Sequence, residues 1–179
     1  MRHFVTQEYL NGIYMGQQQY KICNTDIKTN GLLDNIKECT IFSSTLARCT
    51  QTVDYVISTY SDINFKVVYS NNLVERGLGE FEGKSKILIR KDKNYFSDGL
   101  FIVEKTPPKG ESLTDFRSRV NSEVQIIKEE SKHTNILVIS HLQVLRMIKF
   151  CIDESFDYTN WHNIHYLHGE ITRENYGKP

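Results

Sequence analysis

The stretch NILVISHLQVLRMIKFCI, residues 135–152, decides the fold class. It begins with Asn135–Ser140, a short and nearly continuous apolar run that is typical of a buried parallel strand. A helical pattern follows at once, with apolar side chains near helical spacing at Leu142, Leu145, Ile148 and Ile152. His141 separates the two elements and is therefore predicted at the carboxyl edge of a sheet, where open α/β folds collect their ligands.

Two more amphipathic helices and three more strands are predicted outside this stretch. Segment 110–132 is the clearest helix, because its apolar residues recur at spacings of three and four, and Ser112 with Asp115 forms a capping-box-like start. Another helix is expected from about residue 46 to residue 60. Strands are expected at CTIFSS (39–44), FKVVYS (65–70) and HNIHYLHGEI (162–171). Short apolar strands that alternate with amphipathic helices predict a layered α/β fold.

Length, charge and cysteine usage limit the class of protein. The 179 residues predict a single domain over 1–179, with the charged and aromatic segment 84–109 as a surface excursion. Basic and acidic residues number 22 each, which argues against nucleic acid or an anionic membrane as a partner. The 4 cysteines are widely spaced, and neither a signal peptide nor an apolar run of about 20 residues is found, so free thiols and a cytoplasmic location are expected. The oligomeric state is left open.

Five positions carry side chains suited to catalysis or anion binding. They are Arg2, His3, Arg48, Glu75 and His141. Arg48 falls in the first turn of a predicted helix, where a cation opposes the helix dipole unless an anion is shared with the free N–H groups. Each position also has a simpler interpretation: a solvated arginine, a polar turn or a structural histidine.

Taken in order, five segments resemble the motifs of the histidine phosphatase superfamily, in its phosphoglycerate mutase-like branch. The family has Arg-His-Gly, Ser-x-Leu-x-Arg-x-x-x-Thr, Leu-x-Glu-x-x-x-Gly-x-x-Glu-Gly, a helix that opens with Gly-Glu-Ser, and a late strand that ends in Ser-His-Gly. The counterparts here are RHF with Gly16, SSTLARCTQT (43–52), LVERGLGEFEG (73–83), GESLTDFRSRV (110–120) and VISHLQVLR (138–146). The resemblance covers nearly the whole chain and implies a three-layer α/β/α sandwich around a mostly parallel sheet.

The same resemblance implies a metal-independent phosphatase that hydrolyses a phosphomonoester through a phosphohistidine. His3 is then the nucleophile and Glu75 the proton donor, with Glu80 and Glu82 nearby as other carboxyl groups. The phosphoryl oxygens are bound by Arg2, Arg48 and His141. No metal or cofactor is implied, and the expected partner is a small phosphorylated substrate. Two alternatives remain open: a phosphoglycerate mutase-type phosphoryl transferase, and a non-catalytic relative that binds a phosphorylated partner.

The chain departs from the family pattern around these residues. Phe4 and Leu142 replace the glycines that follow the two histidines, so both side chains must point away from the phosphate pocket or narrow it. Tyr9 falls where the family has an asparagine. The strand that leads into Arg-His is expected to be missing or truncated, since a single residue precedes Arg2. NGLLDNIKEC (30–39) is expected to be the remnant of the family's first long helix.

Two further segments carry residues of interest. His162, His165 and His168 suggest a zinc site, but His165 would face away from the other two on a strand, which favours surface or structural imidazoles. The segment RKDKNYF (90–96) mixes basic and aromatic residues. It is interpreted as a solvated loop, with a lid over a phosphorylated substrate as the alternative.

Overall fold

A three-stranded parallel sheet lies at the centre of the computed structural model, which describes residues 1–28, 31–153 and 157–174. Its strands, in the order β2-β1-β5, are β1 (Glu38–Ser44), β2 (Asn64–Ser70) and β5 (Asn135–Ile139). Phe42 of the central strand pairs with Val68 on one side and Val138 on the other. All residues of β1 after Glu38 are buried, as expected for a strand covered on both faces. The predictions for these three strands are confirmed.

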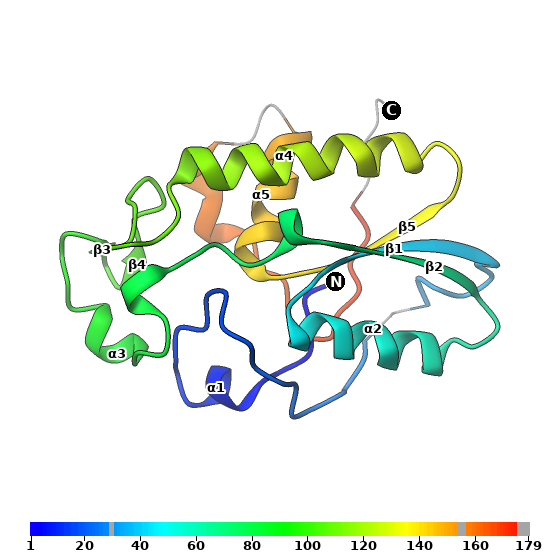
Figure 1. The fold of residues 1–179 in the computed structure, drawn as a ribbon, viewed down its shortest axis with the longest axis horizontal. Coiled ribbons are helices and arrows are strands. Elements are labelled where there is room, and N and C mark those ends of the chain that lie inside the picture. Colours follow the sequence, from blue (N-terminus) through cyan, green and yellow to red (C-terminus); the bar gives the residue numbers. More distant parts are fainter. Residues whose placement is uncertain (29–30, 154–156, 175–179) are drawn as a thin grey trace.

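Helices cover both faces of this sheet, as Figure 1 shows. α2 (Ala47–Thr59) lies on one face, and α4 (Leu113–Glu130) and α5 (Leu142–Ile152) lie on the other. Ser112 caps α4 as expected, because its hydroxyl accepts a hydrogen bond from the backbone N–H of Asp115 at 3.0 Å. Separate apolar clusters fill the space between the layers. The predicted helices and the three-layer α/β architecture are therefore confirmed.

The first residues of the chain extend the sheet beyond β5 through one bridge residue, Arg2. Arg2 forms one parallel bridge with Ser140 and another with His168. The backbone N–H of His3 donates to the Ser140 carbonyl at 3.0 Å, and that of Gly169 donates to the Arg2 carbonyl at 3.1 Å. The first strand of the family pattern is thus reduced to isolated bridges at Arg2. This short ladder holds Arg2 and His3 at the carboxyl end of β5.

The strand predicted at 162–171 is wrong. A 3₁₀ helix, η3 (Tyr158–Asn163), is followed by irregular backbone with isolated bridges at two residues, the first of which is His168. The guanidinium of Arg146 donates to the Ile164 carbonyl at 2.8 and 2.9 Å. A side chain therefore occupies the acceptor that a neighbouring strand would need, and alternating apolar residues alone do not make a ladder.

The helix expected at 30–39 is also wrong. Residue 30 lies outside the described residues, and the chain forms turns from 31 to 35 before it enters β1. Gly31 and Asn35 both adopt positive φ, 74° and 65°. This left-handed backbone conformation cannot continue a right-handed helix.

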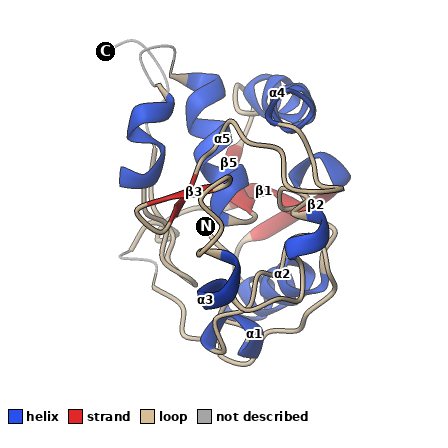
Figure 2. Cartoon of the chain, turned by 90° about the vertical axis from the view of Figure 1, so that its left-hand side faces the viewer, coloured by secondary structure: helices blue, strands red, loops and turns tan. Residues whose placement is uncertain are grey.

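Segment 84–109 has secondary structure of its own. It holds α3 (Lys86–Ile89) and a two-stranded antiparallel ribbon of β3 (Phe96–Ser97) and β4 (Leu100–Phe101). Phe96 packs with Leu78 and Phe81 in a small apolar cluster separate from the main core. This part of the chain faces the viewer in Figure 2.

The remaining helices are each a single turn or slightly more. They are α1 (Gln7–Leu10), η1 (Asn71–Leu73) and η2 (Gly79–Phe81). Within the described ranges, none of the helices has the length and apolar character needed to cross a membrane.

Candidate functional site

His3 and His141 lie next to each other at the carboxyl end of β5. Their ring centroids are 5.2 Å apart. His3 follows the bridge residue Arg2, while His141 is the N-cap residue of α5. Both side chains are almost inaccessible to solvent, with 1% and 0% of their surface exposed. Two segments about 140 residues apart are thus brought together, as the sequence predicts.

One hydrogen bond fixes the protonation of the His3 ring. Its Nδ1 lies 2.6 Å from the carbonyl oxygen of Phe4. Since a carbonyl can only accept, Nδ1 carries the proton and Nε2 keeps its lone pair. Burial, followed by the positive charges of Arg48 and Arg2, lowers the pKa of His3 well below its ordinary value. The ring is therefore a neutral base at neutral pH.

Arg48 connects His141 to a loop on the other side of the site. Its Nε donates to His141 Nδ1 at 3.2 Å, while Nη1 and Nη2 donate to the carbonyls of Gln18 and Gly16 at 2.8 and 2.7 Å. His141 must then carry its proton on Nε2, which lies 2.8 Å from the hydroxyl oxygen of Ser44. Burial and the charge of Arg48 lower the pKa of His141 as well. These bonds explain why a buried arginine is stable in the first turn of α2.

Gly16 is required in that loop for a steric reason. Its φ is 48°, and a Cβ at this position would lie 2.0 Å from the carboxylate of Glu82. That carboxylate accepts from the backbone N–H groups of Gln17 at 3.1 Å and Leu78 at 2.9 Å. Glu82 therefore holds the loop, and the loop carbonyls in turn hold the Arg48 guanidinium.

Of the three glutamates considered from the sequence, only Glu75 lines the cavity that Arg2 and Arg48 also line. Its carboxylate accepts from the N–H of Arg76 at 3.0 Å. Burial raises its pKa above the ordinary value, against the opposing effects of that hydrogen bond and of the nearby arginines. Glu80 instead forms an exposed ion pair with Lys109 at 2.9 Å, and Glu82 has the loop role described above. Glu75 is thus the carboxyl group suited to donate a proton.

A cavity of about 410 Å³ brings three of the five predicted residues to one surface: Arg2, Arg48 and Glu75. The rings of His3 and His141 lie beneath this surface and do not line the cavity. Leu142 lines the cavity and narrows it. Phe4 points away, since its ring packs edge-on against Tyr55 with centroids 5.2 Å apart and belongs to the apolar cluster beside α2.

His168, for which the sequence suggested a zinc ligand or a surface or structural imidazole, lies beside His3 in the site. Its Nδ1–H donates to the backbone carbonyl of His3 at 2.8 Å, and its ring lies 5.0 Å from the His3 ring and 4.4 Å from that of Tyr9. Burial, then the charge of Arg2, lowers its pKa to about 4. His168 Nε2 and Arg2 Nε are buried without a hydrogen-bond partner. The sequence carries no signal for the contact between His168 and His3, because it depends on the bridge between Arg2 and His168.

The other two histidines of this segment lie apart from His168. His162 contacts the Phe101 carbonyl through Nε2 at 2.8 Å, and the side chain of His165 is exposed. Among the described residues, no group of three or more histidines, cysteines or acidic residues is arranged to bind a metal.

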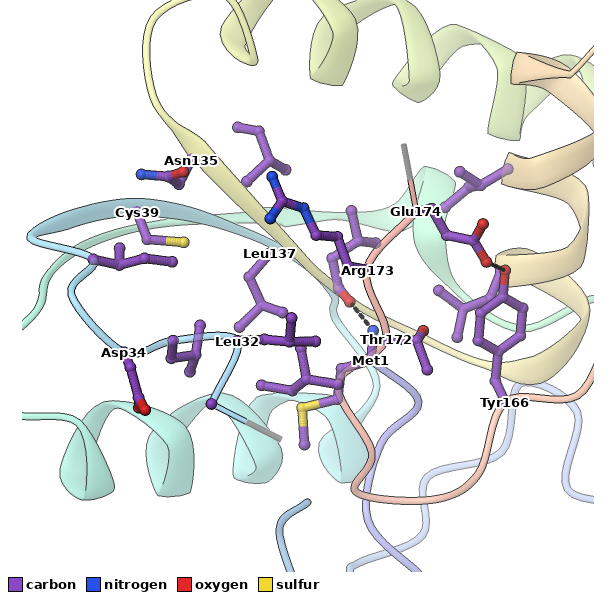
Figure 3. A pocket seen from close by; sticks show the side chains of 18 residues that line it. Met1, Leu32, Asp34, Cys39, Asn135, Leu137, Tyr166, Thr172, Arg173 and Glu174 are labelled. Atoms are coloured by element: carbon purple, nitrogen blue, oxygen red, sulfur yellow. Dashed lines mark hydrogen bonds between the residues drawn. The ribbon is translucent and has the colours of Figure 1, made fainter. Parts of the chain in front are cut away.

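A second cavity, of about 420 Å³, lies along the other part of β5 (Figure 3). Met1, Leu137 and Tyr166 are among its lining residues, and the Tyr166 hydroxyl donates to Glu174 at 3.1 Å. None of the five predicted site residues lines it. The predicted site residues that reach a cavity therefore line the first one.

Comparisons with known proteins bear on the family and the fold. The family model described as "Histidine phosphatase superfamily (branch 1)" matches residues 1–178. The alpha-ribazole phosphatase from Shigella flexneri is 21% identical, with a TM-score of 0.71 over 94% of this chain and 85% of that chain. The mycobacterial glucosyl-3-phosphoglycerate phosphatase is 17% identical, with a TM-score of 0.71 over 93% of this chain and 83% of that chain. The phosphoglycerate mutase from Bacillus anthracis is 20% identical, with a TM-score of 0.70 over 86% of this chain and 78% of that chain. No curated protein matches the chain.

Proposed function

This chain belongs to the histidine phosphatase superfamily (branch 1) and is an enzyme of phosphatase type, and we propose that it hydrolyses a small phosphomonoester through a phosphohistidine on His3. The observation that carries this proposal is the buried pair of neutral histidines, 5.2 Å apart, next to Arg2 and Arg48. A phosphomonoester carries close to two negative charges, and this group of donors complements it in a chain of zero net charge.

The first step is attack on phosphorus by His3. Its Nε2 has the free lone pair because Nδ1–H is bonded to the Phe4 carbonyl. The low pKa of His3 keeps that lone pair available at neutral pH. A nitrogen–phosphorus bond forms, and the bond from phosphorus to the ester oxygen breaks. The product is phosphohistidine, together with an alkoxide that must be protonated.

Glu75 supplies that proton and later removes one. Its raised pKa keeps the carboxyl group protonated above the usual range, so it can protonate the leaving alkoxide. The resulting carboxylate then takes a proton from a water molecule that attacks the phosphohistidine. Inorganic phosphate leaves, and both His3 and Glu75 return to their starting states.

The charge on the phosphoryl group is balanced by three donors. The guanidinium groups of Arg2 and Arg48 line the cavity. His141 supplies the third donor once its Nε2–H exchanges the hydroxyl oxygen of Ser44 for a phosphoryl oxygen. Phosphoryl transfer depends on positioning and charge stabilisation more than on covalent chemistry. The fixed bond between Arg48 and His141 supports the proposal because it orients two of these donors together.

The test is hydrolysis of phenyl phosphate by the full chain in the presence of EDTA. His3→Ala is expected to abolish phosphate release, and His133→Ala, which changes an exposed histidine at the end of α4, is the matched control. Thermal unfolding confirms that each variant is folded, and His3→Asn provides a second variant. An alkali-stable, acid-labile phosphate is expected on wild-type His3 after quenching. Undiminished hydrolysis by both folded His3 variants would refute the proposal.

Two outcomes would favour the alternative functions. Isomerisation of a phosphoglycerate without release of phosphate would favour a mutase, as the likeness to a phosphoglycerate mutase suggests. Measurable binding of a phosphorylated ligand without trapped phosphohistidine would favour a non-catalytic relative. The near-complete burial of the His3 ring is the observation that makes this second outcome worth measuring.

A further inference from the structure

A buried ion pair at the start of α4 contacts the loop that carries Glu75. Arg119, in the second turn of α4, pairs with Glu111, which precedes the helix, at 2.6 Å between Nε and Oε1. The two side chains are only 17% and 15% exposed. A buried ion pair contributes little net stability, because the cost of removing two charges from water offsets most of their attraction. The other contacts of this pair therefore matter more than its own attraction.

Arg119 makes five hydrogen bonds, as many as its guanidinium has N–H groups. Nε and Nη2 donate to the two carboxylate oxygens of Glu111, at 2.6 and 2.9 Å. Nη1 donates to the backbone carbonyls of Asn72 and Val74 at 2.7 and 2.8 Å. Nη2 also donates to the backbone carbonyl of Glu75 at 3.1 Å. One side chain of α4 thus holds three carbonyls of the segment that ends at Glu75.

Glu111 contacts the same loop after Glu75. Its Oε2 accepts from the backbone N–H of Gly77 at 3.0 Å, and its own backbone N–H donates to the Gly77 carbonyl at 2.9 Å. The loop 16–19 adds a further donor, because Nε2 of Gln17 lies 3.0 Å from the Glu75 carbonyl. The backbone is therefore held on both sides of Glu75.

The residue next to Glu75 anchors the loop in another direction. The Arg76 side chain is fully buried and donates to the backbone carbonyls of Val103 at 2.8 Å, Lys105 at 2.9 Å and Glu111 at 3.2 Å. Its backbone N–H donates to the Glu75 carboxylate at 3.0 Å. The carboxyl is thus bonded to a backbone segment that is itself fixed at several points.

We propose that Arg119 and Glu111 are positioning residues, which together hold the Glu75 carboxyl in the cavity at the place from which it protonates the leaving group. Neither of the two lines that cavity, so they act through Glu75 and not on the substrate. A displacement of about 1 Å in a reacting group can lower a rate about 10²-fold. This inference rests on the proposed phosphatase function, because it concerns delivery of the proton in that reaction.

Titration of the Glu75 carboxyl by NMR tests this role without turnover. The full chain is labelled with carbon-13 at its glutamate carboxyl groups, and Glu75→Gln assigns the signal. Burial raises the pKa of Glu75 in the wild type. In Arg119→Met the carboxyl is expected to reach water, so its pKa should fall toward the ordinary value. Loss of the Arg119 charge alone would raise that pKa, so the direction of the shift separates displacement from a purely electrostatic effect.

Arg117→Met is the matched control. Arg117 lies on the same helix, but it is exposed and its guanidinium lies 4.9 Å from the centroid of the Phe150 ring. This variant removes the same charge without touching the loop, so the pKa of Glu75 should not change. The charged side chains that face the carboxyl are kept in both variants: Arg2, Arg48, Arg76 and Arg146.

Two more variants address folding and geometry. Arg119→Met leaves the Glu111 carboxylate buried without its partner, so the Arg119→Met/Glu111→Met double variant provides a case without that unpaired charge. Arg119→Lys keeps the charge but has three N–H donors instead of five, and it should give an intermediate shift of the Glu75 pKa. Thermal unfolding shows that each variant is folded.

Hydrolysis rates are the second measurement. Arg119→Met is expected to lower kcat for butyl phosphate at least about tenfold with little change in KM. p-Nitrophenyl phosphate should be slowed much less, because its leaving group needs no proton. A general loss of structure would slow both esters alike.

The positioning role and the phosphatase function fail in different ways. No hydrolysis of any ester by the wild type would refute the phosphatase function, while the titration would still decide whether the ion pair holds the carboxyl. A lowered Glu75 pKa in Arg119→Met that is partly restored in Arg119→Lys would support the positioning role. An unchanged or raised pKa in both the folded single and double variants, or equal losses of rate on the two esters, would overturn it.

Discussion

Phe4 offers the sharpest test of how the site is built. The family pattern has a glycine after the nucleophilic histidine, so a bulky residue there can be interpreted as a block to activity. In this structure Phe4 is only 1% exposed and its ring faces Tyr55 and Gly169 in the core, away from the cavity. We therefore expect Phe4→Ala to lower the stability of the protein without raising its activity.

The size of the effect follows from the burial. Replacing a fully buried phenylalanine by alanine costs about 3–5 kcal/mol, including the cavity that is left. For a protein of this size such a loss lowers the melting temperature by roughly 6–20 °C. The bonds from His3 Nδ1 to the Phe4 carbonyl and from the Phe4 N–H to the Thr52 hydroxyl involve only backbone atoms of Phe4 and survive the substitution. Activity per folded molecule is therefore expected to stay within about twofold.

The assay combines thermal unfolding with initial rates on phenyl phosphate well below the melting temperature. Leu10→Ala is the matched control, because Leu10 is a nearby apolar residue that is 61% exposed, and its substitution is expected to change stability by less than about 0.5 kcal/mol. A Phe4→Ala variant with an unchanged melting temperature and a raised kcat would refute the reasoning. It would mean that the side chain narrows the catalytic pocket.

Two other variants test the proton donor and the neighbour of the nucleophile. Glu75→Gln is expected to slow hydrolysis of an alkyl phosphate by about 10²–10⁴-fold, but to slow p-nitrophenyl phosphate far less, because a good leaving group needs no proton. In the wild type, kcat/KM for the alkyl ester should fall as pH rises through the raised pKa of Glu75, because the carboxyl group loses the proton that it donates. On the acid side the activity should persist to well below pH 6.5, because His3 gains a proton only there. Equal losses of rate on both esters in Glu75→Gln, or a wild-type rate that rises with pH, would contradict this role. His168→Ala removes the donor to the His3 carbonyl and is expected to lower kcat by roughly tenfold with little change in KM, while His168→Asn restores a donor and part of the rate. A fall in melting temperature with unchanged kcat would leave His168 a purely structural role.

The sequence predicts the central fold well where the local pattern of apolar residues is strong. The run at 135–140 and the helix after it have strong periodicity, so the position of His141 between them follows directly. The same is true of α4, where Ser112 supplies a cap that is visible in the sequence. These elements depend on local patterns, and their tertiary partners only reinforce them.

Prediction fails where a side chain from elsewhere determines the backbone. Segment 162–171 alternates like a strand, yet Arg146 takes the Ile164 carbonyl, and His168 joins the sheet by a single bridge. The direction of the Phe4 side chain also cannot be predicted from the sequence, because it depends on which side of the bridged segment around Arg2 faces α2.

The contacts of Arg48 with the loop have a consequence for phosphate binding. Its guanidinium has five N–H donors, and three of them are engaged by His141, Gln18 and Gly16. The other two remain for a phosphoryl group, so binding need not release the loop. Because the three bonds fix the orientation of the guanidinium in advance, this donor does not have to reorganise as charge develops during the proposed transfer.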